Sequence, residues 1–278
     1  FDYNNANRMT AGFTATHTPF DWLTHRLTFG TDLTNQAEDN LDAFLAGTFA
    51  EYYSSSSAAG GRRINRESVS YTTFDYAATG ERTLTDDLAS TTSAGFQVYT
   101  KSVKDLTASG RRFPALGLTA VSATGQDVTG SDGLVENNTV GVYLQQQFGW
   151  KDRFFITGAV RADDNSSFGE DFSLVYYPKV SSSFVVNDAL RVRAAYGESG
   201  QQPDAFDALR SFTTRLSPTG GATVTPLSPG NSELGPERGV EIEAGFDATL
   251  FNGRVTVDFT YYDQKTKDAI VARYVPPS

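Results

Sequence analysis

The sequence predicts an all-β fold: a segment of an antiparallel, up-and-down transmembrane β-barrel with about ten strands. Three observations support this prediction. Apolar and polar side chains alternate with a period of two along much of the 278-residue chain, as expected for strands with two unlike faces. Most alternating stretches reach the roughly 9–11 residues that a tilted strand needs to cross a bilayer. The connections between them are alternately short and long, which is typical of transmembrane barrels.

The alternation is clearest towards the C-terminal end of the chain. Val240, Ile242 and Phe246 fall on one face of an extended segment, whereas Glu241 and Glu243 fall on the other. An Arg or Lys facing lipid at mid-depth would cost about 2–4 kcal/mol, so we expect the apolar face to contact lipid and the charged face to line the interior. The expected strands cover residues 8–18, 25–34, 67–84, 88–104, 138–149, 153–164, 171–187, 189–200, 237–250 and 254–268.

The turns follow the same pattern. Short connections are expected at 20–24, 85–87, 150–152, 187–189 and 252–253, and long ones near 35–66, 105–137, 165–170 and 201–236. The Asn252-Gly253 pair favours a tight hairpin, because both residue types tolerate a positive φ. Aromatic residues lie at or beside the short turns, where a barrel places its interfacial belt; they are Phe20, Trp22, Phe148, Trp150, Phe154 and Phe251.

Three stretches depart from the strand pattern. Leu41, Phe44 and Leu45 fall at helix-like spacing, so the segment from Glu38 to Tyr53 is the best helix candidate. The run SSSSAAGGRR at 54–63 is too polar to order itself by burying apolar surface. Residues 217–235 are rich in Pro, Gly, Ser and Thr, which predicts an extended loop.

The composition excludes several classes of protein. Acidic residues number 33 against 23 basic ones, a net charge of −10, so a nucleic-acid partner is not expected. The chain has no Cys, which excludes disulfides, thiolate metal sites and cysteine nucleophiles within it. No run approaches the roughly 18 consecutive apolar residues of a spanning helix.

The sequence offers little support for metal binding or catalysis. His17 and His25 have no partners at ligand spacing and are expected to be wall or turn residues. The D-x-N-x-S run from Asp163 could begin a calcium loop, but Phe168 stands where an EF-type loop needs Gly. The stretch GESGQ at 197–201 does not match the G-x-S-x-G elbow of hydrolases. We therefore expect no catalytic residue, no metal and no cofactor, and hence no enzyme.

Three motif-bearing stretches resemble one family. RADDNSSFGEDFSLVYYPKVSSSFVV (161–186), LRVRAAYGESGQQP (190–203) and GNSELGPERGVEIEAGFDATLFNGRVTVDFTYYDQKTKDAIV (230–271) are similar, in order and spacing, to SusC/RagA-type TonB-dependent transporters. TSAGFQVYTK (92–101), followed by RRFPALGL (111–118), is a weaker likeness. Tyr177-Pro178-Lys179 stands where that family has Phe-Pro-Ser, and Ser232 replaces a Pro. These departures affect the substrate subclass rather than the fold.

The resemblance implies a plugged barrel of the 22-stranded class. Residues 1–278 are then a partial barrel domain with the plug domain absent, because about ten strands cannot close such a barrel. The chain opens with FDYNNANRMT, without a signal peptide, and ends in VPPS, without a terminal aromatic residue. We therefore expect an interior fragment from the C-terminal half of the barrel wall.

The resemblance also implies a function, a location and partners. The parent protein would import a nutrient such as a glycan or peptide across the outer membrane of a Gram-negative bacterium. Its partners would be the TonB complex, reached through the missing plug region, a SusD-like surface lipoprotein, and outer-membrane lipid. A passive porin or a surface adhesin is the alternative. A soluble secreted β-sandwich is a third hypothesis, and it predicts that the isolated fragment stays in solution without detergent. We expect the fragment to aggregate instead, through its unpaired edges and its apolar face.

Two groups of residues are candidate site residues. The outer loops would contact substrate through Tyr52, Tyr53, Phe206, Phe212 and Arg215. The polar wall of the interior would comprise Arg161, Arg191, Arg193, Glu241, Glu243, Asp247, Arg254 and Asp258. These charges either line a solute path or solvate the interior and contact the plug, and the second interpretation is favoured because every such barrel has a polar interior. Arg161 with Asp163 and Asp164 is either an ion-pair cluster in the interior that holds the wall to the plug or, as we favour, a strand end and turn.

Overall fold

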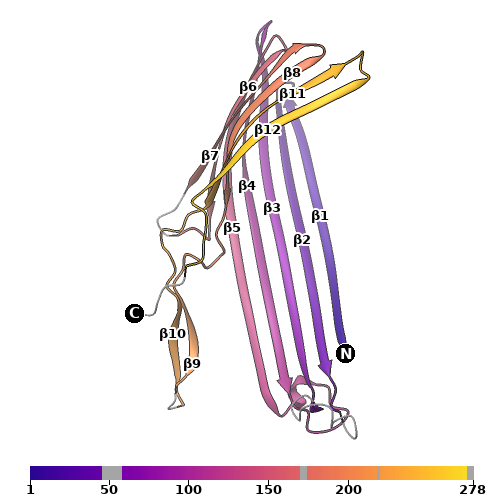
Figure 1. Ribbon diagram of the computed structural model, residues 1–278, viewed down its shortest axis with the longest axis vertical. Helices are drawn as coiled ribbons and strands as arrows, with labels where there is room; N and C mark the ends of the chain where they lie inside the picture. The colour runs from indigo at the N-terminus through magenta and orange to yellow at the C-terminus, as the bar shows by residue number, and fades with distance from the viewer. Residues whose placement is uncertain (46–57, 170–173, 218–219, 274–278) are drawn as a thin grey trace. The chain divides into compact units, whose positions relative to one another are not determined.

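The computed structural model describes residues 1–45, 58–169, 174–217 and 220–273, and strands dominate this part of the chain (Figure 1). The strands are β1 (Asp2–Phe20), β2 (Leu23–Asp42), β3 (Gly61–Thr85), β4 (Leu88–Arg111), β5 (Gln126–Trp150), β6 (Phe154–Asn165), β7 (Val175–Asn187), β8 (Leu190–Gln201), β9 (Ser211–Leu216), β10 (Ala222–Ser228), β11 (Glu237–Leu250) and β12 (Val255–Lys267). A short 3₁₀ helix, η2, spans Val121–Ala123. Among the described residues, no helix combines the length and the apolar character needed to cross a membrane.

Ten strands form one up-and-down antiparallel sheet in the order β1-β2-β3-β4-β5-β6-β7-β8-β11-β12, while β9 and β10 pair only with each other in a second, two-stranded sheet. This confirms the predicted fold class and all ten predicted wall strands. The chain divides into two compact units: unit 1 comprises Phe1–Phe13, Phe29–Thr73 and Thr100–Asn137, and unit 2 comprises Thr14–Thr28, Phe74–Tyr99 and Asn138–Ser278.

Unit 2 contains a sheet with two unlike faces. Its register aligns Tyr143 with Arg161 and Arg161 with Tyr177, so that alternate residues of neighbouring strands share a face. On the opposite face Ile242 is 56% exposed and Phe259 is 53% exposed. A soluble β-sandwich would cover such side chains with a second layer. In the described part of unit 2 these apolar side chains are exposed, as expected for a face that contacts lipid.

Aromatic side chains lie at the short turns of unit 2, as predicted. The rings of Phe20 and Trp22 stack with centroids 5.8 Å apart, and the Arg82 guanidinium lies 4.1 Å from the Trp22 ring centre. Phe154 and Phe184 pair across β6 and β7. Asn252 and Gly253 both have positive φ, at 56° and 85°, which confirms the tight hairpin expected there.

Polar side chains form contacts between neighbouring segments of unit 1, in addition to the backbone pairing of its strands. Arg8 donates to the Asp32 carboxylate at 2.7 Å, and Arg62 donates to both Asp39 oxygens, at 2.9 and 2.5 Å. Arg62 also donates to the Thr119 carbonyl oxygen at 3.0 Å. The Arg62 guanidinium lowers the pKa of the Asp39 carboxyl below its ordinary value by hydrogen bonding and by its charge.

Two predictions about the connections were wrong. A helix was expected from Glu38 to Tyr53, but the first residues of this segment belong to β2, which continues to Asp42. Residues 46–57 lie outside the described part of the chain. The expected loops at 35–66, 105–137 and 201–236 are partly strand, because β2 to β5 extend further than their alternation indicates and β9 and β10 interrupt the last loop. These extensions carry polar residues at both odd and even positions, as in QDVTGSDG at the start of β5, so the alternation of apolar and polar residues does not mark them as strands.

Candidate functional site

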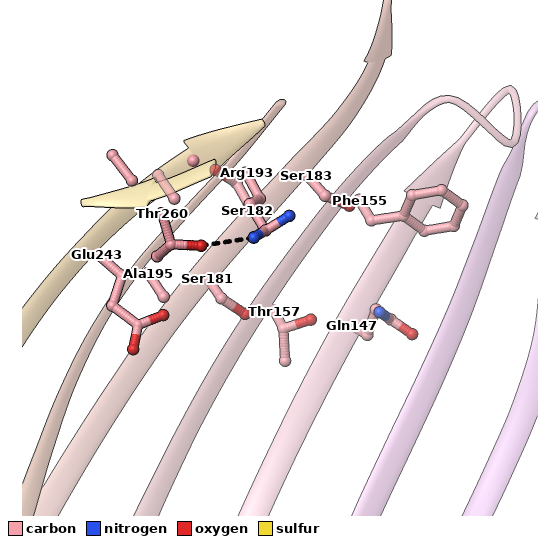
Figure 2. Close-up of a pocket in the computed structure, with 13 residues that line it drawn as sticks. Gln147, Phe155, Thr157, Ser181, Ser182, Ser183, Arg193, Ala195, Glu243 and Thr260 are labelled. Carbon is pink, nitrogen blue, oxygen red and sulfur yellow. Dashed lines mark hydrogen bonds between the residues drawn. The ribbon is translucent and has the colours of Figure 1, made fainter. Parts of the chain in front are cut away.

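The polar face of unit 2 carries most of the predicted wall residues. A shallow groove lies on this face between β5 and β12 (Figure 2). Its polar lining side chains include Gln147, Thr157, Ser181, Ser183, Arg193 and Glu243. They come from β5, β6, β7, β8 and β11, which the register brings side by side in this order. The groove is therefore rich in hydroxyl, amide and charged groups that can hydrogen-bond to a polar solute or to another polypeptide.

Arg193 is the centre of an ion-pair network at one end of this groove. Its guanidinium donates to Asp247 and, at 2.7 Å, to Asp258. It also donates to the Thr260 hydroxyl at 2.6 Å, the bond drawn in Figure 2. Arg191 donates to the second Asp247 oxygen at 2.9 Å. The network joins β8, β11 and β12 and brings together four of the predicted wall residues.

Glu241 and Glu243 lie beside a gap in the same face. Glu241 is opposite Gly197 of β8, and Gly197 is opposite Lys179 of β7, so a glycine separates an acidic from a basic side chain. A Cβ at Gly197 would meet nothing within 4 Å. The face therefore offers a small recess with charges of opposite sign on its two sides.

Arg161 and Asp163 form a second cluster on the polar face. Arg161 donates to Asp163 at 2.7 Å and to the Gln97 side chain at 3.0 Å. Both residues lie among the last five residues of β6, which a turn follows, so the structure places an ion pair at a strand end, and a contact of this pair with the plug stays a prediction. Asp164 is opposite Val140 and lies on the other face. Arg254 also departs from the prediction, since it lies in the turn before β12 rather than in the strand.

The candidate substrate residues are distributed between a turn and a hairpin. Phe206 lies in a turn after β8 and is 52% exposed, and Phe212 of β9 is 54% exposed. Phe212 is opposite Pro226, whereas Arg215 is opposite Thr223, so the two side chains lie on different faces of the β9–β10 hairpin. Tyr52 and Tyr53 lie outside the described residues.

A buried polar cluster at the start of the segment that leads to this hairpin was not among the predicted site residues. It comprises Asn165, Thr139, Ser167 and Gln202 and is called the Asn165 junction here. The Asn165 side chain donates to Thr139 and Gln202, both at 2.6 Å, and accepts from the Ser167 amide at 2.7 Å. Asn165 is 4% exposed and Ser167 is 1% exposed. Their presence in the N-S-S-F-G and G-Q-Q-P runs is a sequence signal, but only the fold brings the two runs together.

The histidines have ordinary partners. His17 and His25 stack with ring centroids 6.2 Å apart, and His25 Nδ1 lies 2.7 Å from the Tyr76 hydroxyl. In the part of the chain that the structure describes, no three His, Cys, Asp or Glu side chains form a group that could hold a metal ion.

Comparison with known proteins gives a family match along the whole chain. The model of the family described as "TonB dependent receptor-like, beta-barrel" matches residues 1–278. TonB-dependent receptor P26 of Formosa agariphila is 27% identical over 146 residues, which cover 46% of this chain and 14% of the receptor. TonB-dependent receptor P3 of the same bacterium is 23% identical over 160 residues, 51% of this chain and 16% of that protein. The chain thus matches a small part of the length of these relatives.

Solved structures share the fold. The RagAB peptide transporter superimposes with a TM-score of 0.89 and 18% identity, over 99% of this chain and 32% of that chain. The siderophore receptor PiuA from Acinetobacter baumannii superimposes with a TM-score of 0.57 and 10% identity, over 94% of this chain and 40% of that chain.

Proposed function

Since the chain belongs to the TonB-dependent receptor-like β-barrel family, we propose that it forms part of the barrel wall and outer loops of an outer-membrane protein that imports a nutrient with energy passed through TonB. The observation that carries the proposal is the contrast between the two faces of unit 2. One face exposes Ile242 and Phe259, while the other pairs Arg193 with Asp247. Lipid outside and water inside would satisfy both faces.

The strand lengths agree with a membrane location. A tilted strand needs roughly 9–11 residues to cross the hydrocarbon layer, and β6, β7, β8, β11 and β12 have 12 to 14. β3 and β5 each have 25 residues. With their short turns at one membrane surface, these longer strands would continue well beyond the other surface, where the protein meets its substrate.

The substrate is a large polar solute, for which peptides and glycans are the two candidates. The RagAB protein, whose fold this chain shares, is a peptide transporter, which favours peptides. We propose that substrate contacts come from Tyr52, Tyr53, Phe206, Phe212 and Arg215, because aromatic rings and a guanidinium suit either solute. We propose that the hydrated interior, which would face a plug domain, is formed by Arg161, Arg191, Arg193, Glu241, Glu243, Asp247, Arg254 and Asp258.

The proposed partners lie at both ends of the barrel. TonB would act through a plug region, and a SusD-like lipoprotein would cover the outer loops. The relatives are named as receptors and transporters, so we infer a protein without catalytic residues.

Uptake measurements test the proposal. In the bacterium that encodes the full-length protein, deletion of its gene should abolish saturable uptake of labelled oligopeptides or of oligosaccharides. Collapse of the proton gradient should abolish the same uptake in the parent strain. A Phe212→Ala variant should raise the KM, whereas Thr213→Ala, on the other face of the hairpin, should not. Uptake that is linear in solute concentration and survives loss of the gradient would indicate a passive porin instead.

A further inference from the structure

We propose that Asn165 is a positioning residue, whose buried hydrogen bonds hold the segment 202–236, and with it the β9–β10 hairpin, in a fixed orientation. The proposal rests on the proposed function in one respect, which is that this hairpin contacts the substrate. The argument for the positioning itself depends only on the contacts around Asn165.

The side chain of Asn165 uses its full hydrogen-bonding capacity. An amide side chain has two N–H donors and an oxygen with two lone pairs. Both donors are used, towards Thr139 Oγ1 and Gln202 Oε1, and the oxygen accepts from the Ser167 amide and the Ser167 hydroxyl. Because Asn165 is 4% exposed, water cannot readily replace a lost partner. Asn165→Asp would remove both side-chain donors, and Asn165→Ala would remove all of these side-chain hydrogen bonds.

The stretch 165–169 contacts the segment 202–236 at its start and near its end. Gln202 is the first residue after β8 and bonds directly to Asn165. Near the other end, the Leu234 carbonyl accepts a hydrogen bond from the Gly169 amide at 3.0 Å. A Cβ on Gly169 would lie 1.9 Å from the Ser232 carbonyl oxygen, so the two backbones are in close contact. The stretch 165–169 therefore holds the segment at its start and near its end.

An apolar contact reinforces this attachment. Phe168, Val175 and Tyr177 form a small buried cluster, in which Val175 is 1% exposed. The Tyr177 ring lies against the backbone of Gly200, where a Cβ would come within 1.9 Å of the phenolic oxygen. Phe168 thus anchors the stretch 165–169 while Tyr177 packs on β8 beside the start of the fastened segment.

The hairpin depends on this base for its orientation. The Asn231 amide donates to the Ala208 carbonyl oxygen at 3.1 Å, so the residues before β9 and those after β10 are hydrogen-bonded to each other. Beyond that point β9 and β10 pair only with each other, and an isolated two-stranded hairpin is marginally stable at best. Phe212 and Val224 on the hairpin are 54% and 63% exposed. The orientation of the hairpin must therefore depend largely on the contacts at the two ends of the segment 202–236.

Limited proteolysis of the full-length protein tests the positioning role. Trypsin cleaves after Arg, and the segment carries Arg210 and Arg215, both exposed. We expect Asn165→Ala to accelerate cleavage at these sites about tenfold, because the buried groups that bond to the Asn165 side chain would lose their partner and local unfolding would become easier. Asn65→Ala is the control: the Asn65 side chain accepts a hydrogen bond from Thr107 in unit 1, and loss of this bond should leave cleavage at Arg210 and Arg215 unchanged.

Folding and transport measurements separate the possible outcomes. The variant should keep the heat-dependent gel mobility of a folded barrel and should raise the KM for uptake while changing the maximal rate little. If Asn165→Ala does not fold, Thr139→Val, which keeps the shape and removes one partner, should accelerate cleavage about threefold. Wild-type cleavage rates in a folded junction variant would overturn the proposal. Failure of the wild-type protein to import any solute would refute the proposed function but not the proteolysis result.

Discussion

The Asn165 junction and the Arg193 ion-pair network are both polar clusters in unit 2, but their environments differ. Asn165 and Ser167 are almost completely buried, whereas the Asp258 side chain that pairs with Arg193 is 68% exposed. A buried hydrogen bond that loses one partner leaves an unsatisfied group, while an exposed ion pair exchanges its partner for water at little cost. The neutral junction should therefore contribute more to local stability than the charged network.

The substitution expected to have the largest effect is Gly169→Ala. The new Cβ would overlap the Ser232 carbonyl group, which is backbone and cannot rotate away. Overpacking of this kind typically costs about 1–3 kcal/mol, and we expect it to separate 165–169 from 231–234. Hydrogen exchange of the full-length protein in detergent should become faster in 231–236. Gly158→Ala in β6, where a Cβ would meet nothing within 4 Å, is the control. Equal exchange in both variants would show that the junction is loosely packed.

The Asp39–Arg62 pair in unit 1 should show an intermediate effect that depends on pH. Its side chains are 13% and 26% exposed, and Arg62 lowers the pKa of Asp39. Because the folded carboxyl holds its proton less tightly than the unfolded one, the contribution of the pair is fully present above about pH 4 and is lost as the pH falls through the lower folded pKa.

This effect is measured at the ends of β2 and β3. Hydrogen exchange there, corrected for the intrinsic rate, should be faster at pH 2.5 than at pH 7, with the pH values chosen to lie on either side of about pH 4. Asp39→Asn should remove most of this difference. A pH dependence that persists in Asp39→Asn would assign it to another group.

The smallest effect is expected for Asp247→Asn on the polar face. Asp247 accepts from both Arg191 and Arg193, but all three side chains are partly exposed, at 26%, 56% and 31%. We expect the midpoint of urea-induced unfolding to remain within error of the wild-type value, since exposed ion pairs contribute little. A clear loss of stability would mean that this network is as important as the buried junction.

The sequence was sufficient to predict what depends on local periodicity. The alternation of Ile242 with Glu243 predicted the faces of β11, and Asn252-Gly253 predicted its turn into β12. The neighbours of Arg193 were not predictable in this way. Asp258 lies 65 residues away, and it becomes a neighbour only because β11 pairs with β8 across the inserted hairpin.

The Asn165 junction was beyond sequence reasoning for a related reason. Its members come from β5, from the last residue of β6 and the turn after it, and from the residue after β8. Their burial depends on packing between irregular segments, for which no periodic pattern exists. The motif resemblance identified the runs that contain Asn165 and Gln202, but not the contact between them.

The most direct test of the two-faced sheet is cysteine labelling at adjacent positions of β11. The chain has no Cys of its own, so Ile242→Cys and Glu243→Cys each introduce one reactive site into this region. In outer-membrane vesicles containing the full-length protein, a water-soluble maleimide should label Cys at 243 and not at 242. A fluorophore placed at 242 should be quenched by lipid-attached spin labels. Equal labelling at both positions, or quenching only at 243, would contradict the assignment of lipid and water to the two faces.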